Sequence, residues 1–188
     1  MRIESDTKLD YNSVLIRPKR STLSSRKEVD LKRHFSFRNY IPDFPENCSE
    51  DSHYRGIPIM SANMDGVGTF EMADTLSKQG IFTCLVKTYS AEELIDFYYH
   101  NSLNRTNYVA ISIGTSDNDF NKLNTVYKKC TNNLKYVCID IANGYSEHFT
   151  ERVHKVRQQF PHLVIIAGNV VTREMTEELI LAGADIIK

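Results

Sequence analysis

The chain has 188 residues, enough for one ordinary domain or slightly more. Its 23 Lys and Arg residues nearly balance its 24 Asp and Glu residues, giving a net charge of −1, which argues against a protein that coats nucleic-acid phosphates. No apolar stretch approaches the ~18 residues that would span a bilayer, and the N-terminus lacks the apolar region of a secretory signal. The four cysteines form no C-x-x-C pair, which favours reduced thiols in the cytosol over disulfides or a zinc site. We therefore expect no nucleic-acid partner, no membrane partner and no metal.

Residues 1–56 are predicted to form an N-terminal extension ahead of the main domain. A basic stretch over 17–27 contains Ser25 and Arg26. An arginine there can bind phosphate in bidentate fashion, with the serine adding a donor. The alternatives are a solvated surface, a nuclear signal and a nucleic-acid patch. Residues 39–56 hold two of the five prolines and many polar residues, so they are predicted to be a surface loop.

Short runs rich in Val and Ile alternate with amphipathic segments over residues 57–188. The runs are almost continuously apolar, which is typical of parallel strands covered on both faces. Strands are predicted over 57–64, 81–87, 108–114, 136–141, 163–170 and 185–188. The strict alternation predicts right-handed crossovers and a parallel sheet. Two architectures have this alternation of strands and helices. One is an open doubly wound sheet, and the other is part of an eight-stranded barrel, which typically needs ~250 residues.

Helix start and stop signals lie between the predicted strands. The sequence Ser90-Ala91-Glu92-Glu93 is a capping box. Gly80 and Gly183 follow helical stretches, as expected for left-handed residues at helix ends. The predicted N-caps are Ser90, Ser116, Ser146 and Thr172. Because the last predicted strand has only four residues, we expect the chain to be a fragment or a truncated product.

Two charged residues close predicted strands, at the edge where α/β folds carry their chemistry. Lys87 is the last residue of the second predicted strand and can neutralise a phosphate or carry a proton. Asp140, in the fourth, can accept a hydrogen bond from a ribose hydroxyl or an amide. The alternatives are a solvated strand-end lysine and a turn or cap aspartate. We expect both side chains to converge on one hollow.

If both point inward, the period-two alternation of strands decides the orientation of their neighbours. The residues then expected in the barrel interior are Thr83, Leu85, Tyr136 and Cys138, while Cys84 and Val86 face the helices. The Gly66-Val67-Gly68 run is similar to part of a dinucleotide-binding loop, but the full G-x-G-x-x-G pattern is absent.

Long stretches of the sequence resemble the IMP dehydrogenase/GMP reductase family of barrels. They are Leu15–Ser21, Ala62–Asp65, Val67–Phe70, Asp140–Phe149, Ala167–Thr172 and Glu177–Lys188. The resemblance implies a (βα)8 TIM barrel, of which residues 57–188 would be about the first five and a half βα units. The reductase branch fits better, because dehydrogenases usually carry an inserted regulatory domain where Lys87 here leads directly into the capping box.

The resemblance implies an NADPH-dependent oxidoreductase that converts GMP to IMP and ammonia, with a cysteine thiolate attacking purine carbon 2 and a hydride replacing the amino group. The cofactor-binding residues that it implies are Ser25, Arg26, Lys87, Asp140, Ile141 and Ala142. The family's catalytic cysteine lies beyond the position of Lys188, so we expect no catalytic residue in this chain. A cytosolic homotetramer is also implied. The alternatives are a non-catalytic product that associates with full-length reductase subunits and an IMP dehydrogenase-like or other barrel enzyme.

Overall fold

The computed structural model describes residues 5–7, 9–37, 39, 53–101 and 103–188, and the chain divides into two units, Met1–Asp30 and Leu31–Lys188. The first unit contains two short 3₁₀ turns, η1 (Tyr11–Ser13) and η2 (Arg26–Glu28). The expected boundary at residue 56 differs from this division, because strand β1 (Arg33–Ser36) pairs with β2 (His53–Ser61) inside the second unit. Most of the predicted 39–56 loop lies outside the described residues, and its last four residues belong to β2.

The second unit is built on a sheet of seven strands that lie side by side in chain order. Strand β1 is antiparallel to β2, and every later neighbour is parallel. Each predicted strand is present, with ends shifted by a few residues. After β1 and β2 come β3 (Ile81–Cys84), β4 (Val109–Ile113), β5 (Tyr136–Asp140), β6 (Val164–Gly168) and β7 (Ile186–Ile187).

Helices connect the parallel strands. They are α1 (Phe70–Ser77), α2 (Ala91–His100), α3 (Leu103–Thr106), α4 (Asp117–Cys130), α5 (Glu147–Gln159) and α6 (Arg173–Leu181). All four predicted N-caps are confirmed, and Ser90 and Glu93 form both hydrogen bonds of the capping box. Gly80 and Gly183 have φ angles of 68° and 109°, which confirms their left-handed positions at helix ends.

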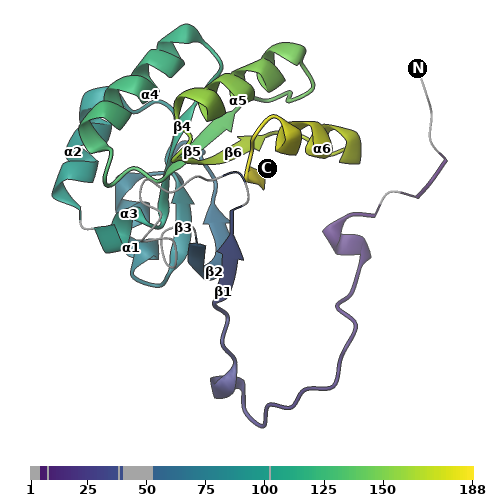
Figure 1. The fold of residues 1–188 in the computed structure, drawn as a ribbon. Helices are drawn as coiled ribbons and strands as arrows, with labels where there is room; N and C mark the ends of the chain where they lie inside the picture. The colour runs from purple at the N-terminus through teal and green to yellow at the C-terminus, as the bar shows by residue number, and fades with distance from the viewer. Residues whose placement is uncertain (1–4, 8, 38, 40–52, 102) are drawn as a thin grey trace. The chain divides into compact units, whose positions relative to one another are not determined.

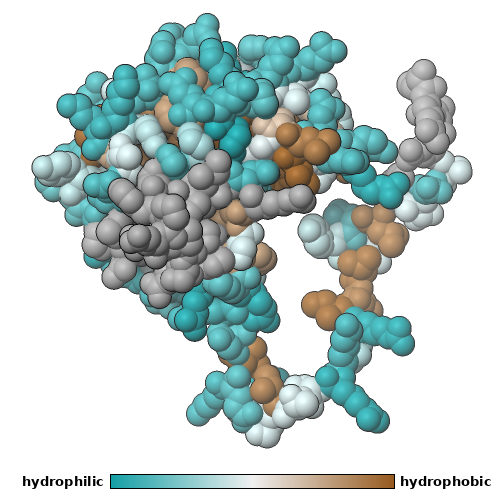
Figure 2. Space-filling model, in the orientation of Figure 1, coloured by the Kyte–Doolittle hydropathy of each residue, from teal (hydrophilic) through white to brown (hydrophobic). Residues whose placement is uncertain are grey.

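The strand order distinguishes between the two predicted architectures, the doubly wound sheet and the barrel. A doubly wound sheet reverses its strand order and carries helices on both faces, whereas here the order is sequential and the sheet curls with its helices on the outside (Figure 1). That arrangement is typical of a TIM barrel. Figure 2 shows mainly hydrophilic side chains over α4 and α5 and a hydrophobic group over α6, where Ile180 and Leu181 are exposed.

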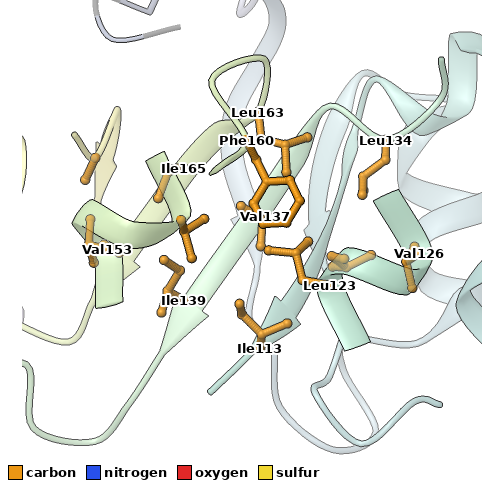
Figure 3. Close-up of a cluster of buried hydrophobic side chains, with 14 of the residues drawn as sticks. Ile113, Leu123, Val126, Leu134, Val137, Ile139, Val153, Phe160, Leu163 and Ile165 are labelled. Atoms are coloured by element: carbon orange, nitrogen blue, oxygen red, sulfur yellow. The ribbon is translucent and has the colours of Figure 1, made fainter. Parts of the chain in front are cut away.

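Two hydrophobic clusters occupy the two faces of the sheet. The outer cluster joins the strands to the helices, and Figure 3 shows Leu123 of α4 near Val137 of β5, with Val126 farther along the same helix. Burial of each such side chain contributes about 1.5–3 kcal/mol. The inner cluster contains strand residues, among them Tyr54, Phe82, Cys84, Ala110, Tyr136, Cys138, Val164 and Ile166. Alternate residues of each strand therefore face the helices or the barrel interior.

The predicted side-chain orientation is confirmed for β5 and wrong for β3. Tyr136 and Cys138 lie in the inner cluster, as expected. Cys84 also lies in the inner cluster, whereas Leu85 packs in the outer one. By alternation Thr83 faces the helices, contrary to prediction.

The aromatic ring of Phe82 explains the orientation of β3. This ring packs edge-on against Tyr136, with the ring centroids 4.9 Å apart, and also against Tyr54 at 5.9 Å. Aromatic side chains thus cover this part of the inner face of the curled sheet, and Cys84 follows Phe82 onto the same face. Strand β3 ends at Cys84, so the alternation does not extend to Lys87.

Candidate functional site

Three polar side chains from distant parts of the chain meet where the parallel strands end. Asp140 is the last residue of β5, Asn63 follows β2, and Lys188 follows β7. The Lys188 ammonium donates hydrogen bonds to the Asp140 carboxylate and, at 2.9 Å, to Asn63 Oδ1. The Lys188 and Asp140 side chains are only 29% and 17% exposed, so water screens this pair less than an open surface pair. We call these three residues the rim cluster.

The sequence predicted part of the rim cluster. Asp140 was expected at this edge of the sheet, and its side chain does face the other strand ends. Asn63 and Lys188 were not expected to take part. A signal was present for Lys188, since it follows two apolar strand residues as Lys87 does. That signal does not say which lysine reaches Asp140, because the distance between chain segments depends on how the sheet curls.

Lys87 takes no part in the rim cluster. It is exposed, and its carbonyl oxygen accepts a hydrogen bond of 2.7 Å from Nζ of Lys122 on α4. Burial lowers the pKa of the Lys122 ammonium. The negative charge of Asp119 raises this pKa, and the positive charge of Lys87 lowers it. Among the described residues no hydrogen bond or ion pair joins Lys87 to Asp140. Asp140 is therefore bonded to Lys188, and convergence of Lys87 on the same hollow stays a prediction.

The loop after β5 is fixed through its backbone. The Ile141 N–H donates to the Gly168 carbonyl and the Ile141 carbonyl accepts from the Asn169 N–H, both at 2.9 Å. Ile141 is half-buried, while Ala142 is exposed and carries only a methyl group. The loop therefore holds Asp140 in a defined place, next to the exposed Ala142. A carboxylate next to small side chains and exposed backbone is chemically suited to an amide and a sugar hydroxyl of a nucleotide.

Ser25 and Arg26 lie in the first unit, at the start of η2. The Ser25 hydroxyl accepts a hydrogen bond from the Lys27 N–H at 3.2 Å, and a hydroxyl that accepts in this way can still donate its own hydrogen. A hydrogen bond of 2.6 Å from Ser24 to Glu28 closes the turn, and this bond lowers the pKa of the Glu28 carboxyl. Arg26 is exposed, so its guanidinium is accessible to a phosphate.

The Gly66-Val67-Gly68 run has a structural explanation. A Cβ atom on Gly68 would lie 2.4 Å from the Cys84 carbonyl oxygen and 2.8 Å from the Val86 nitrogen. The Val86 N–H donates to the Gly68 carbonyl at 2.8 Å. Glycine is therefore required where this loop crosses the end of β3, and the run gives no separate support for a dinucleotide-binding loop.

The described cysteines are poor candidates for an exposed nucleophile. Cys84, Cys130 and Cys138 are all buried and not in disulfides, and Cys48 lies outside the described residues. A hydrogen bond with Cys138, together with burial, raises the pKa of the Cys84 thiol. The same hydrogen bond lowers the pKa of Cys138 against the effect of burial. Burial raises the pKa of Cys130. Reactive thiolates are usually partly exposed, so none of these three fits that role.

In residues 5–7, 9–37, 39, 53–101 and 103–188, no three His, Cys, Asp or Glu side chains gather in a group able to hold a metal ion. The helices described in the same ranges are all too short or too polar to cross a membrane.

Comparison with known proteins identifies the family. The IMP dehydrogenase / GMP reductase domain description matches residues 8–188. The protein "GMP reductase" of Caenorhabditis elegans is 51% identical over 187 residues, which are 100% of this chain and 49% of that protein. "GMP reductase 2" of Bos taurus is 52% identical over 99% of this chain and 50% of its own length. The chain thus spans about half the length of the curated relatives it matches.

A solved structure shares the fold. The crystal structure of inosine 5′ monophosphate dehydrogenase from Legionella pneumophila superposes with a TM-score of 0.72 at 23% sequence identity, over 94% of this chain and 48% of that chain. This confirms the prediction of a partial TIM barrel. Since the family description also covers nearly the whole sequence, the chain belongs to the IMP dehydrogenase/GMP reductase family.

Proposed function

We propose that this chain is the cofactor-binding part of an enzyme that reduces GMP to IMP and ammonia with NADPH. The observation that carries the proposal is the identity of about half of all residues, along the entire chain, with proteins named GMP reductase. The rim cluster agrees with it, because it places a fixed carboxylate at the edge where TIM barrels bind their ligands.

In this proposal, the residues at the rim orient the nicotinamide end of the cofactor. The Asp140 carboxylate accepts from the carboxamide or from a ribose hydroxyl, while Ile141 and Ala142 line the space beside it. Lys87 contributes a positive charge near the same edge. Bound NADPH supplies a hydride for purine carbon 2. The Lys188 ammonium holds the Asp140 carboxylate in place, so this carboxylate is oriented before the ligand arrives.

The basic turn is proposed to bind the other end of the cofactor. The Ser25 hydroxyl and the Arg26 guanidinium donate to the adenosine-side phosphates, and an arginine at a 2′-phosphate favours NADPH over NADH. We propose that no residue of this chain is the nucleophile, because the three described cysteines are buried and the family resemblance leads us to expect the catalytic cysteine after the position of Lys188. We further propose GMP as the substrate and a cytosolic homotetramer as the assembly.

An active chimera tests the proposed reaction. Residues 1–188 are fused to the part of the Caenorhabditis elegans relative that the match leaves uncovered; the matched part is 51% identical over 187 residues. The fusion is expected to oxidise NADPH only when GMP is present, with IMP and ammonia as products. The 188-residue chain alone is the control and is expected to show no turnover. Reduction of NAD⁺ with IMP by the fusion would instead assign the dehydrogenase reaction, and GMP-dependent turnover by the chain alone would contradict the absence of a nucleophile.

The role of Arg26 is tested in the same fusion. Arg26→Ala is expected to raise KM for NADPH about tenfold with little change in KM for GMP, since it removes a charge-assisted hydrogen bond of ~1.5 kcal/mol or more. Lys27→Ala removes a neighbouring charge and serves as the matched control, with KM for NADPH expected to stay within about twofold. An increase in KM for GMP instead would show that the basic turn binds the substrate.

A further inference from the structure

Three sulfur atoms meet on the inner face of the sheet, directly below the rim cluster. They belong to Met60 of β2, Cys84 of β3 and Cys138 of β5. The Cys84 Sγ atom lies 3.3 Å from the Met60 Sδ atom, and the Cys84 and Cys138 thiols, both in the inner cluster, lie close enough to shift each other's pKa. Cys138 precedes Asp140 by two residues in the same strand, so both side chains point to the same face.

The intervening strand explains why the thiols can meet. Strand β4 lies between β3 and β5. Its residues level with the cysteines are small, since Cys84 pairs with Ala110 and Ser112 pairs with Cys138. Larger residues at Ala110 and Ser112 would separate the two sulfur atoms. The sulfur cluster, as we call Met60, Cys84 and Cys138, is therefore built by β2, β3 and β5, with small residues of β4 leaving room between the last two.

A disulfide does not fit these positions. Neighbouring strands lie ~4.8 Å apart, so two strands separated by a third are ~9 Å apart. A disulfide requires Cα atoms within ~7 Å of one another. Cys84 and Cys138 are therefore placed to share a ligand between their sulfur atoms and not to bond to each other.

We propose that the sulfur cluster binds one soft monovalent cation, Cu(I), through two thiolates and one thioether. Cysteine and methionine sulfur are the ligands that select Cu(I) over harder ions. Three ligands at ~2.3 Å from a metal in a trigonal plane lie ~4 Å apart, so the 3.3 Å contact between Met60 and Cys84 has to open only slightly. Binding transfers no electrons and releases one proton from each thiol to solvent.

The surroundings suit such a complex. Two thiolates and one Cu(I) carry a net charge of −1, and the positive charge of Lys188 acts on both thiols, opposed by Asp140. The two cysteines are at most 1% exposed, whereas Met60 is 36% exposed. Met60 lines a cavity of about 360 Å³ on the inner face of the sheet, together with Phe82 and Tyr136. A cation in this cavity can therefore contact the Met60 thioether first and reach the two cysteines from there. This inference does not depend on the proposed enzymatic reaction.

Anaerobic titration of the 188-residue chain against the coloured Cu(I)–bicinchoninate complex tests the proposal. The chain is expected to remove one equivalent of Cu(I), with native mass spectrometry showing one copper per chain. Cys84→Ala and Cys138→Ala should each weaken binding at least about a hundredfold. Met60→Leu keeps the side-chain volume and both thiols, and should weaken binding about tenfold.

Two further variants serve as controls. Cys130→Ala removes a buried thiol of the outer cluster, and Cys48→Ala removes the cysteine outside the described residues; both should leave binding of one equivalent unchanged. Circular dichroism checks that each variant remains folded. Failure of the wild-type chain to take up Cu(I) would overturn the proposal. Folded Cys84→Ala and Met60→Leu variants that bind Cu(I) as tightly as the wild type would overturn it as well.

Discussion

Replacing Asp185 by alanine is expected to lower the free energy of unfolding by about 3–5 kcal/mol, because it leaves the buried Arg157 guanidinium bonded to backbone carbonyls alone, with no carboxylate to balance its charge. The Asp185 side chain is fully buried and accepts a hydrogen bond of 2.5 Å from Arg157. It also accepts from the Ile165 N–H at 2.9 Å. Burial raises the pKa of the Asp185 carboxyl, while the Ile165 N–H and the Arg157 charge oppose that rise. Urea denaturation of wild type and variant gives the difference directly.

An exposed ion pair of the same domain provides the matched control. Lys78 and Asp74 interact at 2.7 Å, but their side chains are 55% and 36% exposed. Lys78→Ala is expected to cost less than about 1 kcal/mol, because water and salt screen such pairs. If Asp185→Ala cost no more than Lys78→Ala, the buried pair would not be the connection between α5 and β7 that the structure indicates.

Replacing Asp140 by alanine is expected to reduce kcat/KM for NADPH about tenfold to hundredfold in the active fusion. The change removes a charge-assisted acceptor, which contributes about 1.5–3 kcal/mol. In this variant the Lys188 ammonium keeps its hydrogen bond to Asn63 Oδ1 but loses the carboxylate. The reduction is measured by steady-state kinetics at saturating GMP.

Asp140→Asn is the conservative control for this experiment. It keeps the shape of the side chain and one oxygen that accepts from Lys188, so it should lose less than Asp140→Ala. Urea denaturation of both variants separates loss of binding from loss of folding. Unchanged kcat/KM for NADPH in a folded Asp140→Ala variant would show that the carboxylate does not contact the cofactor.

Local signals in the sequence predicted most of the fold. A serine or threonine before acidic residues marks a helix start because its side chain satisfies backbone N–H groups of the first turn, and all four predicted caps are present. Alternation of strands and helices predicted the parallel sheet. The order of strands, which separates a barrel from a doubly wound sheet, is a long-range property, and the sequence reaches it only through the family resemblance.

The orientation of β3 shows where local patterns fail. Phe82, Thr83, Cys84 and Leu85 are all buried, so the apolar run has no polar side from which to infer the inner face. The packing of Phe82 against Tyr136 decides the orientation instead, and these residues are far apart in the sequence. The same reason explains why Lys188 was missed: its contact with Asp140 depends on how closely β7 approaches β5 in the curled sheet.

The most direct test of the central claim, that the rim beside Asp140 binds the cofactor, is an NMR titration of the ¹⁵N-labelled 188-residue chain with NADPH. We expect chemical-shift changes at the backbone amides of Ile141 and Ala142, and we expect Asp140→Ala to remove them. The amide of Tyr127, which packs among the helices, should stay unchanged. Absence of shifts at residues 141–142, or equal shifts in wild type and Asp140→Ala, would contradict the claim.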